Sequence, residues 1–131
     1  MIGLVVVAHG GLARELLAAT EHVVGPLPRA VAVSTGPADD LRVKQAEINA
    51  AVAEVDAGDG VVVVTDMFGG TPCNLAIGAM GDERVEVVYG ANLPLLVKLA
   101  KTRERPLADA IDAAIESGRK YVDAAKRMLS P

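Results

Sequence analysis

The chain has 131 residues and a net charge of −4, and 51% of its residues are hydrophobic although only 2% are aromatic. This length fits one domain, expected over residues 1–131, with a core of aliphatic side chains. The charges are scattered and no basic patch alternates with aromatics, which argues against nucleic-acid binding. No apolar stretch is long enough to cross a membrane, no basic leader opens the chain, and a single cysteine fits a reducing compartment, so we expect a cytoplasmic protein.

Four short apolar runs alternate with stretches of helical periodicity. The runs, predicted to be strands, are Ile2–Ala8, Ala30–Ser34, Gly60–Thr65 and Arg84–Tyr89. The predicted helices are Leu12–Val24, Leu41–Val55, Thr71 to about Met80, Leu93 to about Lys101, and Leu107–Ser117.

Turn and capping residues mark the ends of these helices. Gly25 stops the first helix, and Asp39 or Asp40 can cap the start of the second. Thr71 is predicted as the N-cap of the third, and Gly118 as the residue that ends the last.

Strands and helices that alternate with short connections predict an α/β fold, a doubly wound and mainly parallel sheet with helices on both faces. We expect the strand order 2-1-3-4, which makes the first and third strands neighbours and places the ligand-binding crevice beside the first strand. The C-terminal segment, residues 120–129, is rich in alanine and can form a helix.

His9 closes the first apolar run, and Asp66 closes the third. Neighbouring strands lie about 4.8 Å apart, so an imidazole and a carboxylate at adjacent strand ends can form a hydrogen bond. Such a carboxylate fixes the tautomer of the ring and leaves its other nitrogen nucleophilic. The alternative is structural, with Asp66 capping a turn and His9 serving as a polar residue at a strand end.

Glycines surround these two residues at the starts of predicted helices. Gly10 and Gly70 give backbone amides room to face an anion, and the hydroxyl of Thr71 can either donate to that anion or act as an ordinary cap. The glycine spacing of a dinucleotide fingerprint and the lysine of a P-loop are both absent. The pattern indicates a phosphate-sized site without nucleotide-binding machinery.

Three segments, in this order, are similar to those of a known family. They are VVVAHG around His9, VTDMFGGTPCN around Asp66, and YGANLPLLV after the fourth run. Together they resemble the mannose-family IIA component of the bacterial phosphoenolpyruvate:sugar phosphotransferase system. The resemblance implies a phosphocarrier in which His9 accepts a phosphoryl group on Nε2 from phospho-HPr and passes it to a IIB component. It also implies that Asp66 orients His9, that Thr71 lies by the phosphoryl group, and that no metal or organic cofactor is needed.

The resemblance also carries expectations about partners. It implies a homodimer, which family members often form by exchanging a fifth, antiparallel strand near the C-terminus, and residues 120–129 are the candidate for that strand as well as for a helix. Because the sequence ends at Pro131 without a IIB domain, we expect a separate IIB partner. The expected role is in mannose-type sugar uptake, in association with a membrane permease (IIC/IID), or in regulation by phosphorylation state.

Two other protein classes share some of these sequence features. Small chelatases of the tetrapyrrole pathway also open with a strand followed by His-Gly, but they use a second histidine, and His22 is poorly placed for that. A signalling module phosphorylated on Asp66 would need paired carboxylates after the first strand, where this chain has His9 and two glycines.

Overall fold

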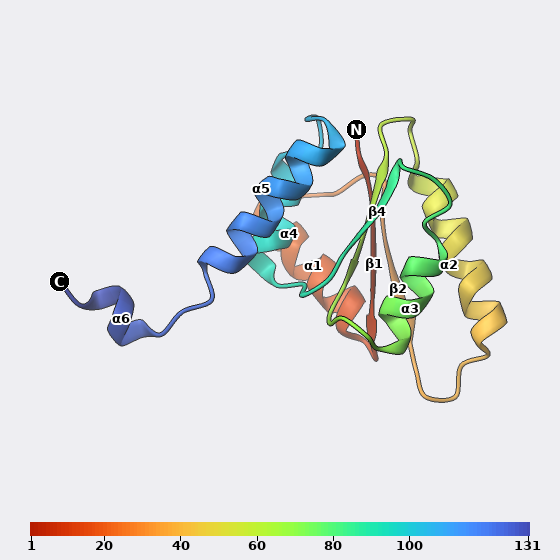
Figure 1. Cartoon of the computed structure of the whole chain (residues 1–131), viewed down its shortest axis with the longest axis horizontal. Helices are drawn as coiled ribbons and strands as arrows, with labels where there is room; N and C mark the ends of the chain where they lie inside the picture. Colours follow the sequence, from red (N-terminus) through yellow and green to blue (C-terminus); the bar gives the residue numbers. More distant parts are fainter.

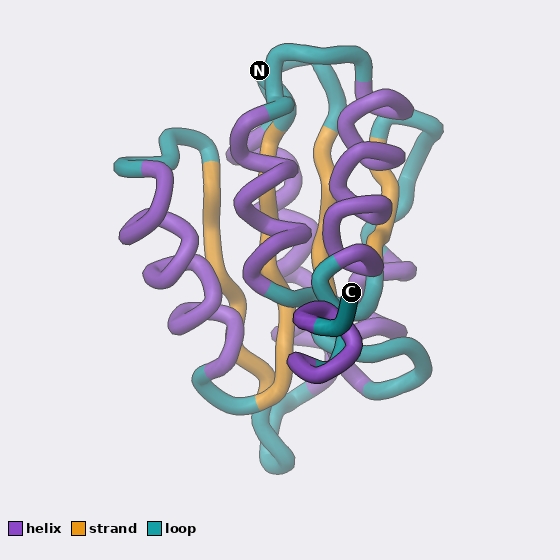
Figure 2. The backbone as a smooth tube through the Cα atoms, turned by 90° about the vertical axis from the view of Figure 1, so that its left-hand side faces the viewer, coloured by secondary structure: helices purple, strands orange, loops and turns teal.

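Four parallel strands form the centre of the molecule in the order β2-β1-β3-β4. In the computed structural model, which describes residues 1–131, their bounds are β1 Gly3–His9, β2 Ala30–Thr35, β3 Val61–Thr65 and β4 Val85–Val88. The predicted fold class and strand order are confirmed. Figure 2 shows the strands side by side. Along the chain, a helix follows each strand.

Helices cover both faces of the sheet (Figure 1). Helices α1, Leu12–Val24, α4, Leu93–Lys101, and α5, Leu107–Lys120, pack on one face. Helices α2, Leu41–Val55, and α3, Thr71–Gly78, pack on the other. None of the helices combines the length and apolarity that a membrane span requires.

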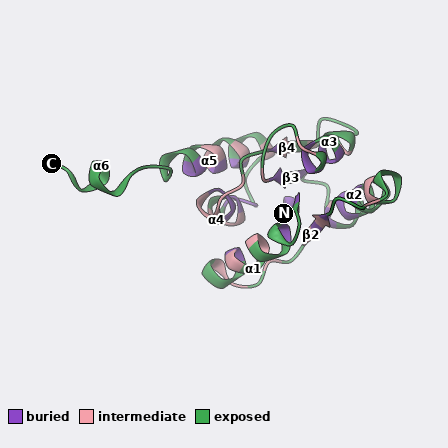
Figure 3. Cartoon of the chain, turned by 90° about the horizontal axis from the view of Figure 1, so that it is seen from below, coloured by how far each residue is buried: buried purple, intermediate pink, exposed green.

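The two faces of the sheet bury two separate aliphatic cores. Side chains of a strand alternate between faces, so Leu4 and Val6 contribute to the core under α1, α4 and α5, where Leu96 is buried. Val5 and Val7 contribute to the core under α2 and α3. Burial on both sides explains why β1 is a continuous apolar run, and in Figure 3 the buried residues gather toward the sheet while the outer sides of the helices are exposed.

The ends of α1 and α2 named here agree with the sequence, and the start of α3 differs. Asp40 caps α2 by accepting hydrogen bonds from the amides of Arg42 and Val43, and α1 ends at Gly25 as predicted. Thr71, predicted as an N-cap, is instead the first residue of α3, and Gly70 takes the cap position with no capping side chain. The backbone of Gly70 is extended, and the helix begins one residue earlier than a cap at Thr71 would place it.

Helix α5 runs through Gly118 to Lys120, so the prediction that Gly118 ends it is wrong. A Cβ at Gly118 would lie 3.0 Å from the Cβ of Leu95, so the residue is small because α4 approaches α5 closely there. Beyond α5, the short helix α6, Ala125–Leu129, stands away from the body, as Figure 1 shows. Within the single chain, residues 120–129 form no fifth strand, since the segment is partly helical and pairs with no strand of its own chain.

Candidate functional site

The structure brings His9 and Asp66 together at the carboxyl edge of the sheet. His9 is the last residue of β1, and Asp66 directly follows β3, which pairs with β1. The ring nitrogen Nδ1 of His9 lies 2.7 Å from Oδ2 of Asp66, and the backbone amide of His9 donates to the same oxygen at 3.0 Å. One carboxylate therefore fixes both the backbone and the ring of His9.

Asp66 is held as an anion. Burial by itself raises the pKa of Asp66, but the hydrogen bonds from the amide and ring of His9 outweigh it, so the pKa of this carboxyl lies below its usual range. Its second oxygen, Oδ1, accepts from the amide of Met67 at 3.0 Å. Since an ionised carboxylate only accepts, the proton of the short contact belongs to Nδ1 of His9. This tautomer leaves the lone pair of Nε2 free on a side chain that is 52% exposed.

Gly70 lies against the other edge of the His9 ring. A Cβ built on Gly70 would be 3.0 Å from Cε1 and 3.2 Å from Nε2 of His9. The φ of Gly70 is −91°, an angle open to any residue, so proximity to the ring rather than backbone conformation requires glycine here. The ring is thus bounded by Asp66 on one edge and by bare backbone on the other.

The starts of α1 and α3 lie beside this ring without capping side chains. Gly11 and Gly70 occupy the two cap positions, and neither helix start receives a side-chain hydrogen bond. The uncapped amides and the helix dipoles make both starts favourable places for an anion. The exposed Thr71 begins α3 next to Gly70, whereas the amide of Gly10 already donates to the carbonyl of Thr35 at 2.7 Å. The amide of Gly10, one of the predicted anion-binding residues, therefore already has a hydrogen-bond acceptor within the protein.

The second histidine lies far along the first helix. His22 is in the last turn of α1, whereas His9 precedes the first turn of that helix. No three His, Cys, Asp or Glu side chains are grouped closely enough to hold a metal ion.

Sequence reasoning missed an aromatic pair at the same edge. Phe68 lies in the loop between Asp66 and Gly70, and Tyr89 directly follows β4. Their ring centroids are 5.0 Å apart. The available signal was composition, because the chain has only one Phe, two Tyr and no Trp, and two of these three rings follow neighbouring strands.

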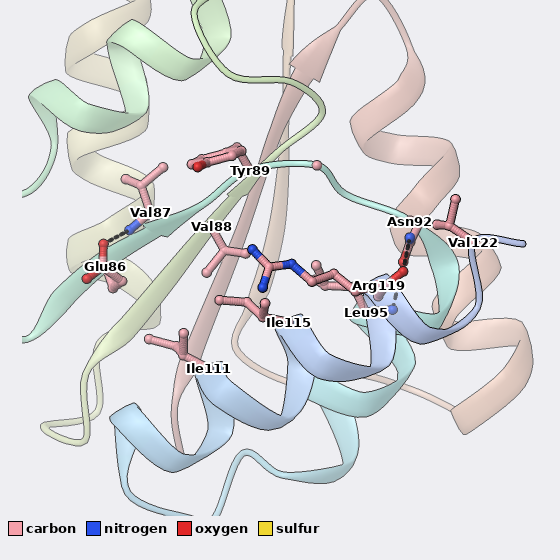
Figure 4. A pocket seen from close by; sticks show the side chains of 12 residues that line it. Glu86, Val87, Val88, Tyr89, Asn92, Leu95, Ile111, Ile115, Arg119 and Val122 are labelled. Atoms are coloured by element: carbon pink, nitrogen blue, oxygen red, sulfur yellow. Dashed lines mark hydrogen bonds between the residues drawn. The ribbon is translucent and has the colours of Figure 1, made fainter.

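A separate groove runs between β4 and α5 (Figure 4). Its apolar floor consists of Val88, Leu95, Ile111 and Ile115, and Tyr89 stands at one end. Strand β4 is the last strand of the sheet, so this groove follows an edge that no other strand covers.

The family model described as "PTS system fructose IIA component" (EIIA-man) matches residues 3–116, nearly nine tenths of the chain. The chain belongs to the EIIA-Man family. This membership confirms the resemblance predicted from the three motifs and makes the protein a IIA component of the phosphotransferase system.

Other members of the EIIA-Man family are similar in sequence and in structure. The mannose-specific EIIAB component of Escherichia coli (strain K12) is 30% identical over 128 residues, 95% of this chain. The chain spans only 40% of the length of that relative. The mannose/sorbose-specific IIA subunit of Enterococcus faecalis is 34% identical with a TM-score of 0.83, covering 94% of this chain and 93% of that one. The IIA protein associated with the fucose utilization operon of Streptococcus pneumoniae is 26% identical with a TM-score of 0.87, covering 97% and 95%.

Proposed function

We propose that the protein is a phosphocarrier that accepts a phosphoryl group from phospho-HPr on Nε2 of His9 and passes it to a IIB component. One observation carries the assignment: Nδ1 of His9 lies 2.7 Å from an anionic Asp66, while Nε2 is free at the surface. An imidazole held in this tautomer is a nucleophile aimed at solvent. EIIA-Man membership supports phosphoryl transfer as the chemistry.

In the proposed step, Nε2 of His9 attacks the phosphorus of the donor phosphohistidine in line with the bond that breaks. The donor imidazole leaves with its electron pair, and the N–P bond to His9 forms. The positive charge that develops on the His9 ring is stabilised by Asp66, which keeps its hydrogen bond to Nδ1. The uncapped start of α3 and the hydroxyl of Thr71 stabilise the oxygens of the phosphoryl group. Transfer to the IIB component is a second in-line displacement, in which the acceptor of IIB attacks the phosphorus and Nε2 of His9 leaves with the electron pair.

We base the proposed physiological role on the names of the relatives. Their printed names refer to mannose, to mannose or sorbose, and to a fucose operon. We propose a role either in uptake of a sugar of this type, with a membrane permease acting downstream, or in regulation through the phosphorylation state of His9. In both roles, the phosphoryl group leaves the site for a IIB component.

We also infer a homodimer. The groove beside β4 is apolar and uncovered, and the C-terminal segment, residues 122–131, exposes Val122, Met128 and Leu129. The proposed occupant of the groove is the α6 part of this segment from a second copy, because Met128 and Leu129 are exposed on α6 away from the body, whereas Val122 itself lines the groove. The homodimers expected from the family resemblance are consistent with this arrangement.

The phosphocarrier proposal is tested by incubating the chain with radiolabelled phosphoenolpyruvate, enzyme I and HPr. We expect one phosphoryl group per chain that is labile in acid, stable in base and absent from His9→Ala. Asp66→Asn should remain folded but accept label about 10- to 100-fold more slowly, because the amide no longer enforces the reactive tautomer.

Other functions predict different labelling results in this assay. Label that hydroxylamine removes would indicate an acyl phosphate, as on an aspartate. Label retained in His9→Ala, or no label in the wild type, would contradict the phosphocarrier assignment.

A further inference from the structure

A basic surface lies on the outer side of helices α4 and α5, which pack against each other (Figure 3). It consists of four cationic side chains from α4, from the turn after it and from the end of α5, namely Lys98, Lys101, Arg105 and Lys120. We call these four side chains the basic cluster. All of them are exposed, and none forms an ion pair. The whole chain has a net charge of −4, so the basic cluster reverses the sign of the charge locally.

The basic cluster surrounds two adjoining hollows between α4 and α5. Their volumes are about 310 and 270 Å³. Lys98, Ser117 and Tyr121 line both hollows, and the other three cations are divided between them. Pockets for small ligands begin at about 300 Å³, so each hollow has room for one small molecule or for one part of a larger one.

The wall shared by the two hollows contains a hydroxyl group without a hydrogen-bond partner. Ser117 is only 9% exposed, yet its hydroxyl forms none of the hydrogen bonds that serine and threonine side chains make in this protein. Thr20 and Thr102, by contrast, each donate to the carbonyl four residues earlier in the chain. A polar group as buried as this normally has a partner, so the open hydroxyl of Ser117 indicates that the hollows receive a hydrogen-bond acceptor.

We propose that the hollows between α4 and α5 bind a small organic phosphate. The proposal does not depend on the chemistry proposed for His9. Four positive charges and the one carboxylate that lines the hollows, Glu116, leave a net charge of +3 around them. A phosphate monoester carries a charge of about −2 at pH 7 and offers three acceptor oxygens. These oxygens match the ammonium and guanidinium donors of the basic cluster and the hydroxyl of Ser117.

The apolar part of the lining suits the carbon skeleton of such a molecule. Pro94, Val97 and Ala113 line the hollows beside the cations. Inorganic phosphate would leave their apolar surface in water, so a ligand that also carries carbon atoms should bind more tightly. No residue of the candidate site around His9 lines either hollow, so the two sites are separate.

The recessed position of Ser117 favours a soluble molecule over a membrane surface. Clusters of Lys and Arg do attract anionic lipids. A bilayer surface would, however, meet the exposed ends of the cations and leave the hydroxyl of Ser117 without an acceptor. A small molecule that enters the hollows contacts both.

The test is a titration of the whole chain with glycerol phosphate at low ionic strength, followed by calorimetry and by NMR of the backbone amides. We expect one saturable site per chain, with amide shifts at Lys98, Ser117 and Tyr121. Lys98→Gln and Ser117→Ala should each raise the dissociation constant about 10-fold, as expected for one lost hydrogen bond to a charged group. Inorganic phosphate should compete more weakly than glycerol phosphate, and glycerol should not bind.

Two variants serve as matched controls. Arg42→Gln removes the same charge as Lys98→Gln from an exposed cation without an ion pair, but on α2, which packs on the other face of the sheet. His9→Ala removes the nucleophile of the candidate functional site. Both should bind glycerol phosphate with the wild-type dissociation constant, and the thermal midpoint of every variant checks that it is folded.

Four results would overturn the proposal. The first is the absence of saturable binding, and the second is wild-type affinity in both Lys98→Gln and Ser117→Ala. An equal loss of affinity in Arg42→Gln would show only a general attraction of anions to the protein, whereas a loss in His9→Ala would place the phosphate at the candidate functional site. Sedimentation with vesicles of phosphatidylglycerol but not of phosphatidylcholine, without binding of glycerol phosphate, would show a lipid surface instead. The labelling of His9 by HPr is a separate measurement, so the failure of this proposal leaves the phosphocarrier proposal intact.

Discussion

At the residue scale, the position of one imidazole ring determines what the candidate site can do. Asp66 determines which ring nitrogen of His9 carries the proton, and Gly70 leaves the opposite edge of the ring unobstructed. The sequence predicted the pairing of His9 with Asp66 because both residues end neighbouring strands. It did not predict the contact with Gly70, because the loop that carries Gly70 has no periodic pattern that would place it against a ring.

Gly70→Ala should slow phosphorylation of His9 by both HPr and phosphoramidate, by about 10- to 100-fold, because a methyl group would displace the ring or occupy the space beside Nε2. The protein should remain folded, since alanine tolerates the φ of −91° at this position. The ¹⁵N chemical shifts of the His9 ring, read by NMR, should move as well, and a purely structural role would not change them.

Gly81→Ala is the control for this variant. Gly81 lies just beyond the other end of α3, and a Cβ there would meet nothing within 4 Å. Wild-type kinetics and ring shifts in Gly70→Ala would show that the close approach to His9 has no functional consequence.

At the element scale, the helices differ in whether a side chain accepts hydrogen bonds from the backbone amides of the first turn. Helices α2 and α4 begin with Asp40 and Asn92, whose side chains accept backbone hydrogen bonds, whereas α1 and α3 begin with glycine. Helices α5 and α6 also lack a capping side chain, and of the four helices without one, α1 and α3 are the two that flank His9. A capping side chain stabilises a helix, so its absence at both of these starts leaves amides available to an anion.

Asn92 connects two helices as well as capping one. Its Oδ1 accepts from the amide of Leu95, and its Nδ2 donates to the carbonyl of Gly118 in α5, both at 2.9 Å. Asn92→Ala should therefore lower the free energy of unfolding by about 2 kcal/mol, as expected for a lost cap together with a carbonyl left without its partner.

Urea denaturation measures this loss of stability. Asn74→Ala is the control, because Asn74 is exposed in α3 and its side chain makes no hydrogen bond. Equal stability of the two variants would show that the link between α4 and α5 contributes nothing.

At the scale of the whole molecule, the site contributes to stability as well as to chemistry. The pKa of Asp66 is lowered in the folded protein, so between that value and the usual value of about 3.9 the unfolded chain binds more protons than the folded one. The stability that Asp66 contributes is thus complete above the usual pKa and is lost as the pH falls through the lowered one.

Urea denaturation of the wild type and Asp66→Asn over a series from pH 6 to pH 2 tests this linkage. The difference in free energy of unfolding between the two proteins should be constant above about pH 5 and should shift against the wild type as acid protonates Asp66. A difference that stays constant over the whole series would show that the carboxylate is no more stable in the folded protein than in the unfolded one.

The sequence by itself determined the strands, most of the helices, the order 2-1-3-4 and the meeting of His9 with Asp66. Those features depend on hydrophobic periodicity and on the rule that parallel strands end at one edge, both of which are local or topological. Only the tertiary structure decided that Gly118 lies inside α5, that Gly70 rather than Thr71 caps α3, and that the amide of Gly10 is occupied by Thr35. The same holds for the contact between Phe68 and Tyr89. Apart from the cap of α3, which depends on the local backbone, each of these depends on how closely two distant segments approach, and that distance is fixed by packing rather than by the pattern of either segment.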